Sequence, residues 1–204
     1  MKMKHSQHYS QYITFFIILC LCYYLYKTIY SSTQLKCIIM DKSGKKYCVR
    51  NRTKIKEAAQ LMASVTDNMK RMVQYMQENH PSDKRTIRLV NGFNPNEITE
   101  TLPTSTLTAY SENKGQKIAM CLNKNKLKGE DELIDLNTLT FVALHELSHI
   151  MTVSIGHKEE FWQNFKFLLE NAQKANIYSP YDYKKQPQKY CGMTLNDNPY
   201  FDYH

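Results

Sequence analysis

The feature that most constrains this chain is the run His-Glu-Leu-Ser-His at residues 145–149, which lies inside a largely apolar stretch. Two histidines at this spacing stand on one face of an α-helix, one turn from each other, so both imidazoles can reach a single ion. The apolar residues from Phe141 to Leu144 would bury the opposite face of the helix. In a chain of 204 residues with 7 histidines, this run has a chance expectation on the order of 0.01. The pattern therefore indicates a metal site on a helix.

Glu146 directly follows the first histidine of this run. In metallopeptidases that share the pattern, a carboxylate at this position lies beside the metal-bound water, where it acts as general base and then passes the proton to the leaving amine. Zinc would lower the pKa of that water toward about 7 and polarise the scissile carbonyl. We therefore expect Glu146 as the catalytic residue and Zn²⁺ as the cofactor, with His145 and His149 as two of its ligands.

A catalytic zinc needs a third protein ligand and keeps its fourth position for water. His157 is the preferred candidate, because Gly156 can reverse the chain after the helix and return the side chain to the metal. Glu159 and Glu160 are the alternatives, and either would complete a site of two histidines and one glutamate. The third ligand thus stays open among these three residues.

An apolar or aromatic run at residues 12–26 continues beyond Lys27 to residue 30. A helix needs about 20 residues to span a bilayer, and Lys27 can extend toward the lipid headgroups. A cleavable signal peptide is the competing interpretation, but bulky residues follow the run where small residues would mark a cleavage site. We therefore expect an uncleaved anchor and a single-pass membrane localisation.

The chain after the apolar run reads as one unit, without internal repeats or a linker rich in Pro, Gly or Ser. The sequence predicts a tail at 1–11, a transmembrane anchor at 12–30 and one domain at 31–204. Within the domain, the hydrophobic patterns predict strands and helices. The expected strands are Leu35–Met40, Lys46–Arg50, Thr86–Val90, Leu107–Ser111 and Lys117–Leu122, with a hairpin turn at 113–115 between the last two. The expected helices cover 55–76, whose methionines we expect in the core, 138–151 and 161–172. This order predicts an α+β fold with a small mixed sheet followed by two helices.

Four cysteines lie outside the apolar run: Cys37, Cys48, Cys121 and Cys191. Cys37 and Cys48 flank a turn sequence between two predicted strands, so a hairpin could bring them face to face. An even number of cysteines is compatible with two disulfides and also with none. The disulfide state stays open.

The net charge of +8 is compatible with nucleic acid, an anionic surface or solubility alone. The densest basic stretch, residues 42–56, has no aromatic side chains interleaved with its charges, as a protein that stacks on single strands would have. We therefore favour a solvated basic surface over a nucleic-acid-binding one.

The segment from Leu144 to Leu169 resembles the zincin domains called WLM and SprT-like. It combines the His-Glu-Leu-Ser-His run with Ile-Gly-His at 155–157 and Phe-Trp at 161–162, although the interval between the second and third histidines is longer than WLM domains usually have. The resemblance implies that His145, His149 and His157 are zinc ligands and Glu146 the base. It also implies that residues 118–122 form the edge strand along which a peptide substrate lies by strand addition.

The tyrosine-rich segments 178–183 and 190–193 are similar to the tails of membrane-anchored zincin-like proteins of large DNA viruses. Tyr183 or Tyr190 could donate a hydrogen bond to an oxyanion, although aromatic packing is the favoured use of both. Together these features predict a membrane-anchored zinc metallopeptidase that acts on a protein or peptide substrate, and the viral resemblance implies a virion or a host membrane as its place. The alternative is a catalytically inactive zincin-fold protein with a structural or binding role at a membrane or in a virion. The oligomeric state is left open.

Overall fold

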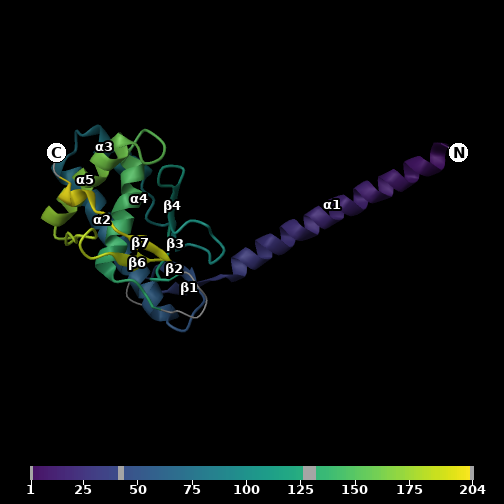
Figure 1. Ribbon diagram of the computed structural model, residues 1–204, viewed down its shortest axis with the longest axis horizontal. Coiled ribbons are helices and arrows are strands. Elements are labelled where there is room, and N and C mark those ends of the chain that lie inside the picture. The colour runs from purple at the N-terminus through teal and green to yellow at the C-terminus, as the bar shows by residue number, and fades with distance from the viewer. Residues whose placement is uncertain (1, 41–43, 126–131, 203–204) are drawn as a thin grey trace. The chain divides into compact units, whose positions relative to one another are not determined.

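A computed structural model describes residues 2–40, 44–125 and 132–202 of the chain. The chain divides into two compact units, Met1–Leu35 and Lys36–His204. The first unit consists essentially of one long helix, α1 (Lys2–Thr33). The second unit holds all the elements that surround residues 145–149 (Figure 1).

The prediction of a transmembrane anchor at 12–30 is wrong. Within the described ranges, no helix combines the length and the apolarity that a bilayer crossing requires. The expectation had counted tyrosine as apolar, although its hydroxyl is polar, and had extended the run across Lys27. The prediction of a single-pass membrane localisation rested on this anchor and is wrong with it.

A five-stranded mixed sheet forms the framework of the second unit, with the strand order β1-β2-β3-β5-β4. Strand β2 pairs in parallel with β3, and β3 pairs in parallel with β5, whereas β4 pairs antiparallel with β5. The strands are β1 (Leu35–Ile39), β2 (Lys46–Arg50), β3 (Ile98–Glu100), β4 (Ala109–Glu112) and β5 (Lys117–Met120). The predicted α+β class with a small mixed sheet is confirmed for this unit.

The edge of this sheet differs from the prediction. Strand β5 lies between β3 and β4, so residues 118–120 belong to an interior strand and β4 forms the edge at this end of the sheet. The hairpin of β4 and β5 was visible in the sequence because Asn113, Lys114 and Gly115 form its turn, all with positive φ. The sequence did not show which strand of this hairpin pairs with β3, because that pairing joins distant segments, as Ile98 and Ile118 do.

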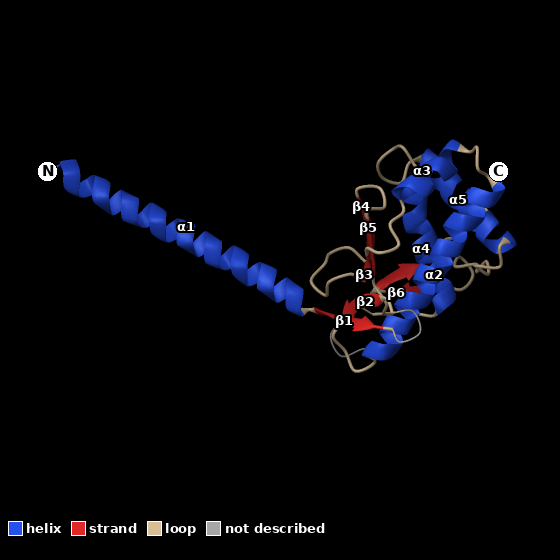
Figure 2. Ribbon diagram, turned by 180° about the vertical axis from the view of Figure 1, so that it is seen from behind, coloured by secondary structure: helices blue, strands red, loops and turns tan. Residues whose placement is uncertain are grey.

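Four helices pack beside the sheet, as Figure 2 shows. They are α2 (Ile55–Asn79), α3 (Lys84–Gly92), α4 (Leu136–Met151) and α5 (Glu159–Lys174). Helix α4 contacts all three of the others, and this explains why most of its side chains are buried. Its first turn is capped by the Asp135 carboxylate, which accepts a hydrogen bond from Thr138 N at 2.9 Å. The methionines along α2 are core residues, as predicted.

Helix α3 replaces the strand that was predicted at Thr86–Val90. The Asp83 carboxylate caps its N-terminus by accepting a hydrogen bond from Arg85 N at 2.8 Å. Thr86 and Leu89 are buried, whereas Ile87 is 46% exposed, which is the periodicity of a helix face. The β-branched residues of this segment favoured a strand, and the segment is too short for its three-residue spacing to indicate a helix.

Two disulfides join all four cysteines that lie outside α1. Cys37 pairs with Cys48 across the neighbouring strands β1 and β2. Cys121 pairs with Cys191, which lies at the turn of a small antiparallel hairpin, β6 (Gln188–Tyr190) and β7 (Met193–Leu195). A short 3₁₀ helix, η1 (Pro199–Phe201), follows this hairpin and packs on α5.

Candidate metal centre and substrate groove

Three histidine nitrogens converge at the C-terminal end of α4. His145 and His149 extend from α4, and His157 comes from the loop that joins α4 to α5. The Nε2 atom of His157 lies 3.0 Å from Nε2 of His145 and 3.2 Å from Nε2 of His149. Zinc–nitrogen bonds of about 2.0–2.1 Å in tetrahedral geometry require separations of this size. Within the described residues, this is the cluster that could hold a metal ion.

The three imidazoles are held in their neutral form. Burial, followed by the neighbouring imidazoles of His149 and His157, lowers the pKa of His145 to about 3. Burial also lowers the pKa of His149 to about 4, and it lowers the pKa of His157. Neutral imidazole is the form that offers a lone pair to a metal. Three such nitrogens are the donor set of zinc sites that keep a position for water, so these residues fit zinc.

Phe161 supports all three rings from the first turn of α5. Its ring centroid lies 4.8 Å from that of His145, 4.4 Å from that of His149 and 4.6 Å from that of His157. The Phe161 side chain is fully buried, so it gives the imidazoles a fixed surface to pack against. The Phe-Trp pair after the third histidine is part of the resemblance to WLM domains, and its phenylalanine packs against all three imidazole rings.

The loop that carries His157 is held by the glutamate that had been an alternative ligand. The Glu160 carboxylate accepts hydrogen bonds from Val153 N at 2.9 Å and from Ser154 N at 3.0 Å, and these donors lower its pKa to about 2. Glu159 accepts a hydrogen bond from Gln163 Nε2 at 3.1 Å. Among the three candidates for the third ligand position, His157 is the residue whose donor atom meets the other two histidines.

Two further contacts fix the loop on either side. Lys114, in the turn between β4 and β5, donates through Nζ to Thr152 O at 2.7 Å and to His149 O at 3.3 Å, at the end of α4. Trp162 donates through Nε1 to His157 O at 3.1 Å. Gly156 adopts a φ of 80°, which lets the chain reverse immediately before the third histidine, as the sequence predicted.

Lys114 can reach α4 because its hairpin turn lies unusually close to that helix. A Cβ atom on Gly115 would come within 2.5 Å of Ile150 Cδ1 and within 2.6 Å of Gly92 O. Only glycine fits between these groups. The sequence indicated that this glycine belongs to a turn, but it did not show that the turn supports the candidate metal site.

Glu146 lies buried on the same helix, with 3% of its surface exposed. Its Oε2 atom has no hydrogen-bond partner among the described residues, and burial raises its pKa to about 8. An unpartnered buried carboxyl group is costly to a fold and is typical of functional sites. The carboxyl group is therefore available to hydrogen-bond with a molecule bound in the groove beside it.

A groove of about 530 Å³ runs between β4 and the end of α4. It is lined by the three histidines, by Glu146, and by residues from the hairpin and from the loop after α4: Leu107, Ala109, Tyr110, Ser111, Asn113, Lys114, Ser154, Ile155 and Gly156. Tyr183 and Tyr190 do not line it, because both are buried in the core. The Tyr190 hydroxyl accepts a hydrogen bond from Cys121 N at 3.1 Å and donates one to Thr108 O at 3.2 Å. Both tyrosines thus have the packing role that the sequence favoured.

A model of the WLM domain matches residues 38–200 of this sequence. The chain belongs to the WLM domain family. WLM domains are zincin-like domains of the metallopeptidase type, and membership suggests zinc as the metal. The resemblance to WLM domains that the motif indicated is confirmed, and the match extends well beyond the motif, from β1 to η1.

The curated relatives of this WLM domain protein are viral. An uncharacterised protein of Acanthamoeba polyphaga mimivirus is 28% identical over 162 residues, which are 78% of this chain and 81% of that protein. Uncharacterised proteins of Invertebrate iridescent virus 6 and Invertebrate iridescent virus 3 are 35% and 39% identical over shorter segments. These segments are 41% and 29% of this chain, and 44% and 36% of the respective relatives. No solved structure matches the chain significantly.

Proposed function

We propose that this WLM domain protein is a zinc-dependent peptidase. In this proposal His145, His149 and His157 hold the metal and Glu146 is the general base. The observation that carries the proposal is the convergence of the three Nε2 atoms beside a buried carboxyl group without a hydrogen-bond partner. A structural zinc is usually closed by four protein ligands and needs no such carboxyl group, so three histidines beside Glu146 favour a catalytic role over a purely structural one.

Zinc, when bound, supplies Lewis acidity that polarises a carbonyl group and lowers the pKa of water. A cation held by the three histidines would favour the ionised form of Glu146, which takes the proton from the attacking water and delivers it to the leaving amine. Its position in the residue after His145 keeps the carboxyl group beside the three imidazoles, and its burial excludes competing solvent. The rigid support from Phe161 and Glu160 holds the histidines in place for this chemistry.

The substrate in this proposal is an extended polypeptide that lies along β4. Strand β4 pairs with β5 on one side only and is the edge of the sheet, and residues of this strand line the groove. Backbone groups on the free side of an edge strand can pair with an extended peptide by strand addition. This arrangement would bring the scissile bond over the histidine cluster, because the groove contains both.

The test compares the full-length chain with its Glu146→Gln and Glu159→Gln variants. Each protein is assayed for bound zinc by atomic absorption and for cleavage of an unfolded protein substrate. We expect zinc in all three, and a rate reduced by about 10²- to 10⁴-fold in Glu146→Gln alone. Glu159→Gln is the matched control, because Glu159 hydrogen-bonds with Gln163 outside the histidine cluster.

Equal cleavage by wild type and Glu146→Gln would contradict the catalytic role of Glu146, and absence of zinc would contradict the metal site. Zinc binding without any cleavage by the wild type would favour a binding role for the same fold.

A further inference from the structure

Among the residues that the structure describes, the lining of the groove offers no free side-chain charge to a substrate. Its one basic lining residue, Lys114, uses Nζ to donate to three backbone carbonyl groups of the α4 end and its loop. Its one acidic lining residue, Glu146, is assigned to the water in the proposed reaction. Asn113 is neutral and already donates to Gln116 Oε1 at 2.8 Å. A charged substrate side chain would therefore lose its hydration without gaining a partner.

Apolar side chains from two parts of the chain line the groove beside the histidines. Leu107 and Ala109 come from the β4 side, and Ile155 comes from the loop between His149 and His157. Leu107 is 54% exposed and Ile155 is 86% exposed, although both are large apolar residues. Covering them with an apolar group would remove this surface from water, which is favourable in proportion to the area removed.

Resting on the proposed function, we infer that the groove selects peptides with a large apolar side chain next to the scissile bond. Ile155 and Leu107 are the specificity-determining residues, and they cover this side chain from opposite sides. Ile155 is two residues before His157, in a loop held by Glu160 and Lys114. The backbone that carries Ile155 is therefore held beside the histidine cluster.

The experiment uses the full-length chain with zinc and three quenched fluorescent peptides that differ only at one residue beside the cleaved bond: Leu, Ala or Asp. We expect kcat/KM for the Leu peptide to exceed that for the Ala peptide by about 10-fold or more, and the Asp peptide to be the poorest. Ile155→Ser should lower kcat/KM for the Leu peptide by about 10-fold and leave the Ala peptide within about 2-fold.

Val153→Ser is the matched control for Ile155→Ser. Val153 lies on the same loop and is 65% exposed, but it does not line the groove. This variant should cleave all three peptides as the wild type does. An equal loss in Val153→Ser and Ile155→Ser, or equal cleavage of the Leu and Asp peptides by the wild type, would overturn the inference.

A binding measurement separates this inference from the proposed function. The full-length Glu146→Gln variant is titrated into the same three peptides, and binding is followed by fluorescence anisotropy. The inference is supported if this variant binds the Leu peptide more tightly than the Asp peptide, and if adding Ile155→Ser weakens that binding. This holds even if the wild type cleaves nothing, and then only the peptidase proposal fails. Equal affinities for the Leu and Asp peptides overturn the inference even if the wild type is an active peptidase.

Discussion

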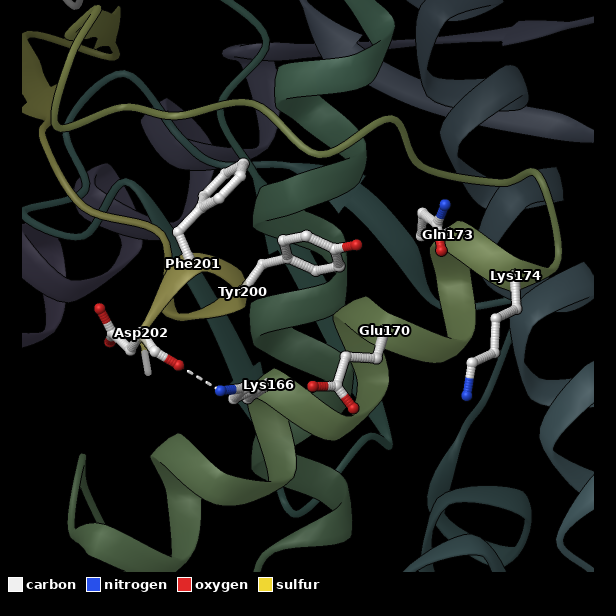
Figure 3. A pocket seen from close by; sticks show the side chains of 7 residues that line it. All are labelled: Lys166, Glu170, Gln173, Lys174, Tyr200, Phe201 and Asp202. Atoms are coloured by element: carbon white, nitrogen blue, oxygen red, sulfur yellow. Dashed lines mark hydrogen bonds between the residues drawn. The ribbon is translucent and has the colours of Figure 1, made fainter. Parts of the chain in front are cut away.

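The groove beside the histidines and a second hollow, between α5 and η1, have similar volumes of about 530 and 630 Å³. Figure 3 shows the second hollow with its lining side chains. Those side chains are Lys166, Glu170, Gln173, Lys174, Tyr200, Phe201 and Asp202. Lys166 Nζ donates there to the backbone carbonyl of Asp202, and the Asp202 carboxylate pairs with Lys184 at 2.8 Å.

The two hollows differ in how their polar groups are satisfied. In the groove, Glu146 Oε2 and Ser111 Oγ are shielded from solvent and have no hydrogen-bond partner among the described residues. Around the second hollow, no such buried unpartnered atom lies among the described lining residues. Buried polar groups without hydrogen-bond partners therefore indicate a functional site better than the volume of a hollow does.

The largest effect is expected for His149→Ala in the groove. Removing one of three nitrogens leaves the metal with two histidine ligands, so bound zinc and peptidase activity should both fall to background. Lys174→Ala, in the second hollow, should leave both within about 2-fold of wild type, as expected for a surface substitution. Zinc content and cleavage rate are the measurements. Retained activity in His149→Ala would contradict the proposed role of the histidines in the groove.

The next largest effect is a loss of stability on removal of the Cys121–Cys191 disulfide. This bond and Tyr190 connect the hairpin β6–β7 to the side of the groove. This disulfide spans 70 residues, so replacing both cysteines by serine should lower the free energy of unfolding by about 4 kcal/mol. Replacing Cys37 and Cys48, which are 11 residues apart, should cost about 3 kcal/mol. Urea unfolding without reductant measures both losses. A greater loss for the shorter pair would contradict the chain-entropy argument.

A smaller effect is expected for Glu160→Gln, which weakens the hydrogen bonds that hold the His157 loop. The affinity for zinc should fall by about 10- to 100-fold, as is typical for groups that orient a metal ligand. Glu170→Gln is the matched control, because it makes the same chemical change on the same helix in the second hollow. Competition with a zinc chelator measures both affinities. If both variants bind zinc equally, the loop is held by other contacts.

The smallest effect is expected for Lys166→Met in the second hollow. This change removes the hydrogen bond from Lys166 to the Asp202 carbonyl and should lower the free energy of unfolding by about 1 kcal/mol or less. Zinc content and activity should not change. Thermal unfolding and the peptide assay measure the two properties. A loss of activity would mean that the second hollow is coupled to the groove.

Local spacing in the sequence predicted much of the candidate site. The interval between His145 and His149 matches one helical turn, and Gly156 provides the reversal that returns His157 to them. The structure brings these three nitrogens together, while their role as ligands remains a prediction. The buried face of α2 and the hairpin turn at Asn113 were predicted because they too depend on neighbouring residues.

What the sequence missed depended on contacts between distant segments. The place of β4 at the sheet edge follows from the pairing of β3 with β5, which no local pattern reports. Glu160 was considered as a ligand because carboxylates bind zinc, yet its oxygens hold the backbone of the preceding loop. A carboxylate in the first turn of a helix often accepts hydrogen bonds from nearby backbone N–H groups, and this was the available signal.

The Cys121–Cys191 bond also encloses the whole candidate metal site within one covalent ring. Helix α4, the His157 loop and α5 all lie between the two cysteines in the sequence. A single cut of the main chain anywhere in this ring would therefore leave one connected molecule. A peptidase that nicked its own copies here would keep its histidines on a single covalent species, and the cut would become visible as two fragments only after reduction.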